Sequence, residues 1–211
     1  MQGICWMCGS RADTREHVFK KSALESFFGA GPYRGDNGVV HVKNGKAKHV
    51  QGPDSERAKY TKILCAKCNN VRSQPFDRAF DRFVKYFRQN DKNIVCERFI
   101  DFEQVYRERW PEEQTNLFKY FVKSLGCRIA DAGLSVPRDL VLLFDFPVFC
   151  TALKITFAVN EDMALLPECD LGLLKGDLFG KHVGVRPPDC PTYIWHENNG
   201  WLAVLRSKRC P

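Results

Sequence analysis

The sequence predicts an α+β protein in two parts: residues 1–90, stapled by a structural zinc ion, and a small α+β unit over residues 91–211. Three observations predict this organisation. Two Cys-x2-Cys pairs lie in the first part, the excess positive charge is confined to the same part, and the second part shows helical spacing followed by strand-like runs. With 211 residues, 44% of them hydrophobic, the chain can bury a core without disulfides.

The distribution of charge along the chain is uneven. Residues 1–90 hold 17 Lys and Arg against 8 Asp and Glu, a net charge of +9, whereas residues 91–211 hold 15 against 17, a net charge of −2. A basic excess in one segment predicts a polyanionic partner, nucleic acid before a membrane surface, and the alternative is a solvated basic face. No uncharged apolar run approaches the roughly 18 residues of a membrane span, and the first residues lack a signal-peptide layout, so we expect a cytoplasmic protein with no membrane partner.

Four of the ten cysteines form two closely spaced pairs, Cys5/Cys8 and Cys65/Cys68. Cytosolic thiols stay reduced, and this spacing lets four thiolates converge on one Zn²⁺ with tetrahedral geometry. The metal would close a loop of 56 residues between Cys8 and Cys65, which is a structural role. The alternative is a redox dithiol at CWMC, which ordinarily follows a strand of a thioredoxin-like βαβ unit that we do not find here.

The other six cysteines are scattered singly, and we expect them to be buried apolar thiols. A second zinc site is the alternative for three residues of the second part, Cys169, His182 and Cys190. Their spacing fits no usual zinc knuckle.

Local signals place the elements of the first part. Asn44-Gly45, between two short β-prone runs, predicts a hairpin over residues 39–50, whose Lys43, Lys46 and Lys48 could contact a phosphate backbone. CAKCNNVRS predicts helical turns, and Pro75 suits the first turn of a helix that continues from them. That helix carries an apolar stripe that we assign to the core: Phe76, Phe80, Phe83, Val84 and Phe87.

Helices are predicted to precede strands in the second part. Helical spacing recurs at Leu117, Phe118, Phe121, Val122 and Leu125. Residues 148–159 and 192–206 are expected to form strands, the latter a hairpin that turns at residues 198–200. No catalytic motif is found over residues 91–211.

Three strings, CWMCG (5–9), REHVFKKSAL (15–24) and CAKCNNVRS (65–73), together and in this order resemble the HNH endonucleases, the ββα-metal nucleases, in the branch stapled by CxxC and CxxCN. The resemblance covers about residues 1–90. It implies that His17 is the general base that deprotonates water, and that Glu16 and Asn69 offer oxygen atoms to one Mg²⁺ or Mn²⁺. Cleavage in the family leaves a 5′ phosphate and a 3′ hydroxyl.

The chain departs from the family pattern at two positions. The carboxylate before the base is often Asp and here is Glu16. The middle Asn that orients the base usually lies just ahead of the CxxCN strand, where this chain has Lys59-Tyr60-Thr61; Asn37 or Asn44 could substitute.

We therefore expect a metal-dependent endonuclease of bacterial or phage type, and we expect its substrate to be DNA before RNA. Arg72, Lys20 and Lys21 are expected to lie near the phosphates. Solvation is the alternative for these three basic residues. Residues 91–211 are assigned to specificity, regulation by a partner, or oligomerisation such as a homodimer. The alternative function is a zinc-stapled module that binds nucleic acid without cutting it. The joint presence of Glu16, His17 and Asn69 favours the enzyme.

Overall fold

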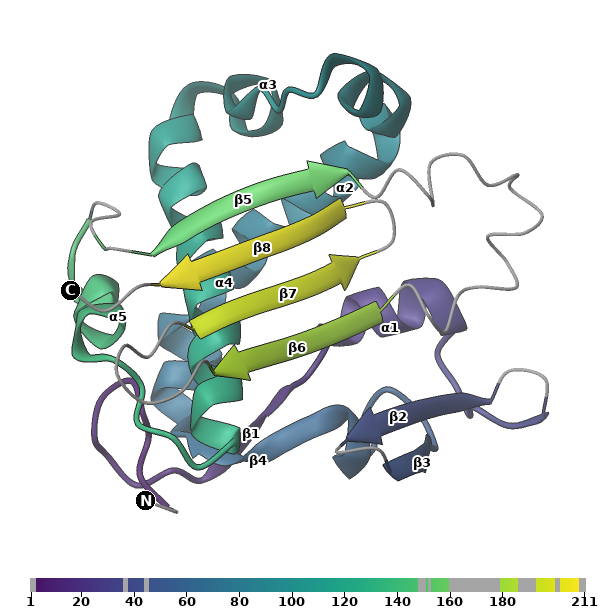
Figure 1. Ribbon diagram of the computed structural model, residues 1–211, viewed down its shortest axis with the longest axis vertical. Helices are drawn as coiled ribbons and strands as arrows, with labels where there is room; N and C mark the ends of the chain where they lie inside the picture. Colours follow the sequence, from purple (N-terminus) through teal and green to yellow (C-terminus); the bar gives the residue numbers. More distant parts are fainter. Residues whose placement is uncertain are drawn as a thin grey trace.

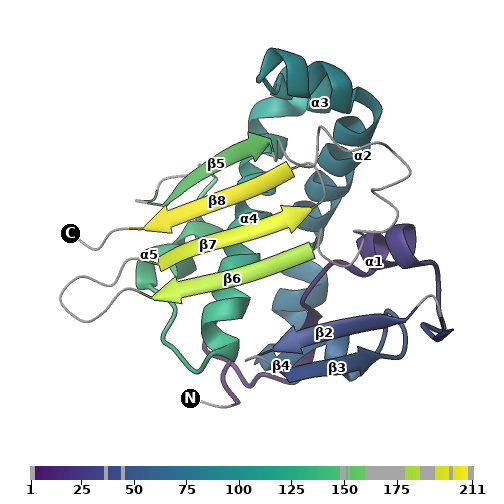
Figure 2. The ribbon, with the colours of Figure 1, turned by 45° about the vertical axis from the view of Figure 1, so that its right-hand side comes forward.

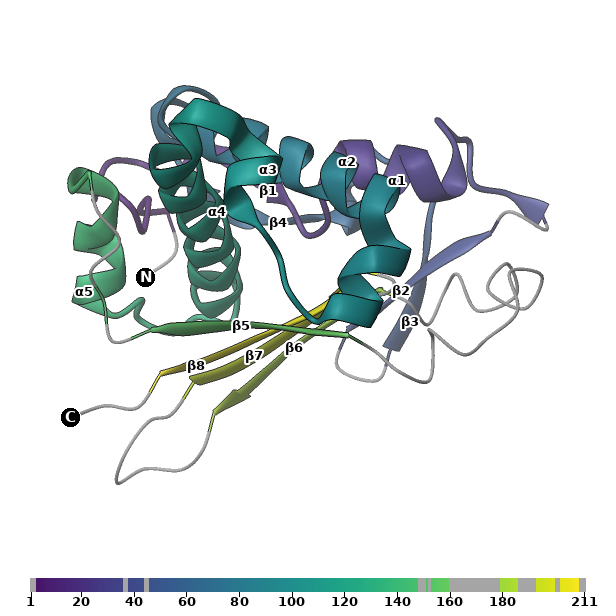
Figure 3. The same ribbon diagram turned by 90° about the horizontal axis from the view of Figure 1, so that it is seen from above.

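The computed structural model describes residues 3–35, 38–43, 46–147, 151, 153–159, 179–185, 193–199 and 202–208. An antiparallel sheet forms one layer, and helices α2, α3 and α4 lie along one face of it (Figures 1 and 3). In chain order, the elements are β1 (Thr14–His17), α1 (Lys21–Phe28), β2 (Val39–Lys43), β3 (Lys46–Val50), η2 (Glu56–Ala58), β4 (Lys59–Leu64), η3 (Lys67–Arg72), α2 (Gln74–Glu97), α3 (Phe102–Tyr106), η4 (Arg107–Arg109), α4 (Trp110–Asp131), α5 (Arg138–Leu142), η5 (Leu143–Asp145), β5 (Lys154–Val159), β6 (Phe179–Val185), β7 (Tyr193–Asn199) and β8 (Leu202–Lys208). The predicted α+β class is confirmed.

The first part of the chain is built on two short strands followed by a helix. Strand β1 pairs antiparallel with β4, so that Thr14 lies opposite Leu64 and His17 opposite Lys59. The chain then enters η3, a π-helical turn that carries Cys68 and Asn69, and continues into α2 with Pro75 in its first turn. This connection places the end of β1 beside the beginning of the helix.

The predicted hairpin over residues 39–50 is confirmed. Strands β2 and β3 pair antiparallel with Lys43 opposite Lys46, and the expected turn residues Asn44 and Gly45 lie outside the described residues. Figure 2 shows the hairpin beside β4 and apart from the larger sheet. Two side-chain contacts hold it there: His41 Nδ1 donates to the carbonyl of Arg57 (2.8 Å), and the Arg57 guanidinium donates to the carbonyl of His49 (2.7 Å).

Helices α2 and α4 supply half of the buried residues of the main core cluster, as their apolar stripes predicted. Phe80 of α2 stacks on Tyr120 of α4 with ring centroids 3.9 Å apart, and Phe83 and Phe121 are almost fully buried. Stacked and edge-on aromatic pairs of this kind add to the free energy gained by burying their area. The core therefore forms where the two helices meet.

This core is continuous across the two parts of the chain. It includes Cys5 and Leu64 of the first part together with Leu125 and Leu153 of the second. The boundary drawn at residue 90 falls inside α2, at a kink where Asn90 adopts a non-helical backbone conformation (φ −128°). Helix α2 therefore runs across the boundary between the two parts, and both parts contribute to one hydrophobic core.

Trp6, in the turn between Cys5 and Cys8, packs against α4 and against Phe144 of η5. Its indole packs edge-on against Phe144 with centroids 5.7 Å apart, and lies so near Gly126 that a Cβ atom built on this glycine would be 2.4 Å from the ring. Only glycine fits at this position of α4 without moving the indole.

Among the described residues, β5, β8, β7 and β6 form a four-stranded antiparallel sheet in that order. The predicted hairpin within residues 192–206 corresponds to β7 and β8, which pair with Asn199 opposite Leu202. Asn198 and Asn199, predicted to form the turn, are the last residues of β7. The predicted strand over residues 148–159 corresponds to β5, which begins only at Lys154. Strand β6 was not predicted, and Cys169 and Cys190 lie outside the described residues.

No helix in the described part of the chain is both long enough and apolar enough to cross a membrane.

Replacement of Gly126 by alanine is expected to lower the free energy of unfolding by about 1–3 kcal/mol, because the new methyl group collides with the Trp6 indole. In a Trp6→Leu background the same replacement should be neutral or stabilising, since alanine is favoured over glycine in a helix by roughly 1 kcal/mol. Urea denaturation of the four proteins measures both effects. An equal cost in the two backgrounds would show that the glycine is required for another reason.

Candidate metal centre and adjoining groove

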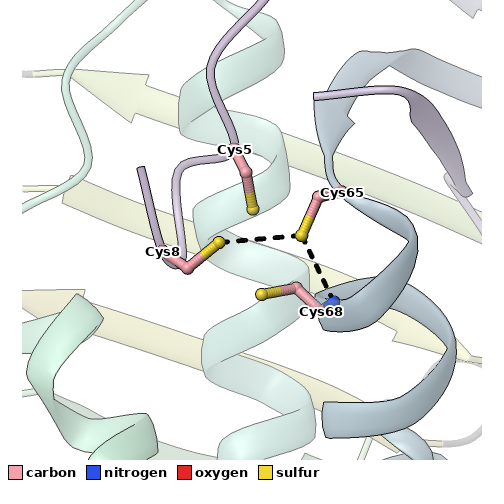
Figure 4. Close-up of side chains that lie close together, drawn as sticks. All are labelled: Cys5, Cys8, Cys65 and Cys68. Atoms are coloured by element: carbon pink, nitrogen blue, oxygen red, sulfur yellow. Dashed lines mark hydrogen bonds between the residues drawn. The ribbon is translucent and has the colours of Figure 1, made fainter. Parts of the chain in front are cut away.

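The four paired cysteines converge on one point. Cys5 and Cys8 lie on a tight turn in which the Gly9 amide donates to the Cys5 carbonyl (2.8 Å), and Gly9 has the positive φ (75°) that this turn requires. Cys65 follows β4 and Cys68 lies in η3. Figure 4 shows the four side chains pointing toward one another from the two segments.

The geometry of the sulfur atoms suits a bound metal ion. All four Sγ atoms lie within 4.8 Å of one another, and those of Cys8 and Cys65 are 3.6 Å apart. Tetrahedral coordination with metal–sulfur bonds of about 2.3 Å places sulfur atoms roughly 3.8 Å apart. The four cysteines can therefore hold a metal ion.

The thiols of this cluster differ in acidity. A hydrogen bond from the Ser10 side chain is the main factor that lowers the pKa of Cys8 to about 6, although partial burial opposes it. Burial raises the pKa of Cys5 and of Cys68 above the ordinary thiol value. Buried neutral thiols gain most from a cation, because coordination replaces their protons with a charge that stabilises the thiolates.

A groove of about 500 Å³ adjoins the cysteine cluster on the side of β1 and α2. It is lined by residues of β1, α1, η3 and α2, and the segments that supply them are distant in the sequence. The lining includes all three residues assigned to catalysis from the sequence, Glu16, His17 and Asn69.

His17 is oriented by a main-chain carbonyl. Its Nε2 donates to the carbonyl oxygen of Pro53 (3.2 Å), and a carbonyl can only accept, so Nε2 carries the proton and Nδ1 is the basic nitrogen. Burial, together with the Lys59 ammonium, lowers the pKa of His17 below its ordinary value, which keeps the ring neutral near pH 7. The Asp54 carboxylate lies 3.8 Å from Nε2. A neutral, fixed imidazole is suited to accept a proton.

The Pro53 carbonyl therefore orients the His17 ring, which is the role that was expected of a middle Asn. Both expected substitutes, Asn37 and Asn44, lie outside the described residues. Sequence reasoning missed Pro53 because the contact uses a carbonyl oxygen, which every residue carries, and no side-chain pattern marks it.

The side-chain oxygen of Asn69 accepts no hydrogen bond from the described part of the chain. Its amide N–H donates to the Cys65 carbonyl (2.9 Å), and its own carbonyl accepts from the Ser73 hydroxyl (2.6 Å), so its backbone is fixed. Its side-chain Oδ1 is buried and has no partner within the described part of the chain. A buried acceptor left unpaired costs about 1–3 kcal/mol, and a hard cation is one group that would satisfy it.

Glu16 faces a lysine from the second part of the chain. Lys123, only 2% exposed on α4, places its Nζ 3.3 Å from Glu16 Oε1, 3.3 Å from Asp77 Oδ1 and 3.1 Å from Ser73 Oγ. Burial alone disfavours the ammonium, yet the carboxylates of Glu16 and Asp77 raise the pKa of Lys123 above its ordinary value. A protonated lysine thus neutralises the carboxylate that the resemblance assigned to Mg²⁺.

Sequence reasoning did not identify Lys123. The available signal was a pair of lysines, Lys119 and Lys123, one helical turn apart in the apolar stretch of α4, where nearly every residue from 117 to 127 is buried. Lysines in so buried a helix need partners, because an unpaired buried charge is very unfavourable.

The basic residues expected near the phosphates are already paired with acidic groups. Lys20 contacts Asp81 Oδ2 (2.7 Å) and the carbonyl of Asp77, and Lys21 contacts Asp54. Arg72 pairs with Asp145 of the second part and lies over the Phe144 ring. Of the hairpin lysines, Lys46 and Lys48 are exposed, and the structure does not describe the side chain of Lys43.

Comparison of the chain with protein-family models, with curated proteins and with solved structures finds no match.

Replacement of Cys65 by serine should abolish stoichiometric metal binding and lower the free energy of unfolding by several kcal/mol, because the binding free energy of a structural metal stabilises the fold. Elemental analysis and thermal denaturation measure the two effects. Cys96→Ser is the matched control, since Cys96 is exposed and outside the cluster. Full metal content in the Cys65→Ser protein would contradict the four-cysteine site.

Replacement of Lys123 by methionine should lower the free energy of unfolding by about 3 kcal/mol, because Glu16 and Asp77 lose their cation. Lys119→Met is the matched control: Lys119 is similarly buried on the same helix, but donates to the main-chain carbonyl of Phe146, so its loss should cost about 1 kcal/mol. Chemical denaturation compares them. Equal losses would show that ion pairing does not determine the cost.

Proposed function

We propose that this chain is a metal-dependent HNH endonuclease that hydrolyses phosphodiester bonds in DNA. The observation that supports the proposal most directly is that one groove is lined both by His17, with Nδ1 as its basic nitrogen, and by Asn69, with an unpaired buried oxygen. The order of elements, two antiparallel strands followed by a helix beside four cysteines, is consistent with the ββα-metal arrangement.

In this proposal, His17 Nδ1 takes the proton from the attacking water while the Pro53 carbonyl holds the ring. Asn69 Oδ1, with Glu16 beside it in the groove, would hold Mg²⁺ or Mn²⁺. The bound ion would supply positive charge for the phosphate oxygens and the departing 3′ oxygen. Lys123 fixes the Glu16 carboxylate. The cysteine cluster would hold zinc, which keeps β4 and η3 beside the N-terminal knuckle.

A second candidate function is nucleic-acid binding without cleavage. The contact of Lys123 with Glu16 and Asp77 favours it, because a resident ammonium already satisfies the carboxylates that a divalent ion would use. In that case the groove needs no metal ion, and the chain acts as a zinc-stapled binding module. Residues 91–211 would contribute specificity, regulation or oligomerisation in either case.

Supercoiled plasmid separates the two functions. Wild-type protein with Mg²⁺ or Mn²⁺ should nick or linearise the plasmid, and EDTA should stop it. His17→Ala should lose cleavage by at least about a hundredfold, the contribution typical of a general base, while keeping the wild-type melting curve and DNA affinity. Retained cleavage would remove His17 from the mechanism. A plasmid that wild type shifts in a gel but never cuts would favour the binding module.

The proposed role of Asn69 as a metal ligand can be tested without measuring cleavage. Asn69→Ala should weaken Mn²⁺ binding, measured by electron paramagnetic resonance of the free ion, without any substrate present. Asn70→Ala is the matched control, because Asn70 also lines the groove but is exposed. Equal Mn²⁺ affinity of the two variants would place the ligand elsewhere.

A further inference from the structure

We infer that a basic pocket beside the groove binds a backbone phosphate of the nucleic acid, next to the phosphate that is cut. The pocket measures about 360 Å³ and is lined by basic residues from three separate segments. They are His41, Lys46, Lys48, Arg57, Lys59 and Arg128. The identification of the ligand as a nucleic-acid strand rests on the proposed function.

Several cations of this pocket lack an acidic partner in the described part of the chain, although the Lys59 ammonium lies 3.6 Å from Asp54 Oδ1. No carboxylate among the described residues pairs with Lys46, Lys48 or Arg128. The one acidic residue that lines the pocket, Asp131, accepts at Oδ1 from both the amide and the hydroxyl of Thr61 (2.9 Å each). Like charges that surround a hollow repel one another, and an anion in the hollow relieves the repulsion.

The contrast with the groove identifies which basic residues are available. Lys20, Lys21 and Arg72 all contact carboxylates, so a phosphate would have to compete for them. Lys46, Lys48 and Arg128 have no such competitor among the described residues, whereas Lys59 pairs with Asp54. Of the basic residues in the two hollows, Lys46 and Lys48 of the hairpin are therefore more available to an anion than Lys20 and Lys21 of the groove.

The walls of the pocket are held in place before any ligand binds. The bond from His41 to the Arg57 carbonyl and the bond from Arg57 to the His49 carbonyl fix the hairpin against η2. Arg128 is carried by α4, which packs on the rigid core. Preorganised cations lose little entropy on binding, which favours affinity.

The position of the pocket favours a polymer over a free phosphate. Consecutive residues line the two hollows, His17 the groove and Val18 the pocket. Lys59 lies opposite His17 in the β1–β4 register and also lines the pocket. A single strand with successive phosphates can reach both hollows, whereas a free nucleotide would use only the pocket.

The test measures binding of a short fluorescein-labelled DNA duplex by fluorescence anisotropy. It uses the His17→Ala protein without added Mg²⁺ or Mn²⁺, so that cleavage plays no part and the metal of the cysteine cluster is retained. Lys48→Ala and Arg128→Ala should each weaken binding about threefold and reduce the slope of log K against log salt by about one, with roughly tenfold for the pair. Lys62→Ala and Arg138→Ala are the matched controls, since both are exposed and outside the pocket.

The outcomes separate the inference from the proposed function. Unchanged affinity and salt slope in Lys48→Ala and Arg128→Ala would overturn the pocket, even if the wild-type protein cuts DNA. Pocket-dependent binding by a wild-type protein that never cuts would keep the pocket and reject the nuclease. ATP or pyrophosphate that binds through Lys48 and Arg128 while DNA affinity is unaffected would replace the strand with a free phosphate ligand. Lys48 is exposed on the hairpin, so its replacement leaves the fold intact.

Discussion

The ammonium of Lys123 is the point at which the two parts of the chain depend on each other. It is buried on α4 and lies within 3.3 Å of carboxylate oxygens on β1 and α2, and 3.1 Å from the Ser73 hydroxyl. Ser73 in turn donates to the carbonyl of Asn69. One cation therefore fixes Glu16 directly and Asn69 through a hydroxyl, so the positions of two candidate catalytic residues are set by a helix that lies outside their own segment.

Much of this fold follows from short-range signals. The Cys-x2-Cys spacings, the Asn44-Gly45 turn and the phenylalanine stripe of α2 each act over a few residues, and the structure has the cluster, the hairpin and the buried stripe where these patterns predicted. The contact of His17 with Pro53 could not be predicted, since it depends on a backbone carbonyl. The burial of Lys123 depends on how α2 and α4 pack, which no local pattern specifies.

Net charge likewise does not show which basic residues are available to a ligand. The sequence shows how many basic residues the first part contains, but the pairing of each one is decided by tertiary contacts. Lys20, Lys21 and Arg72 stand close to the candidate catalytic residues in sequence, and each contacts a carboxylate in the structure. Lys48 and Arg128 are 80 positions apart and line the same pocket. Availability to a ligand is a property of the fold and not of composition.

The contact of Trp6 with Gly126 bears on how this protein can evolve. Many small catalytic modules act as cassettes that recombination can join to new neighbours. Here the indole beside the cysteine cluster needs a glycine on α4, and Glu16 needs a lysine one turn earlier on the same helix. A recombination event near residue 90 that replaced α4 would separate Trp6 and Glu16 from both of these partners.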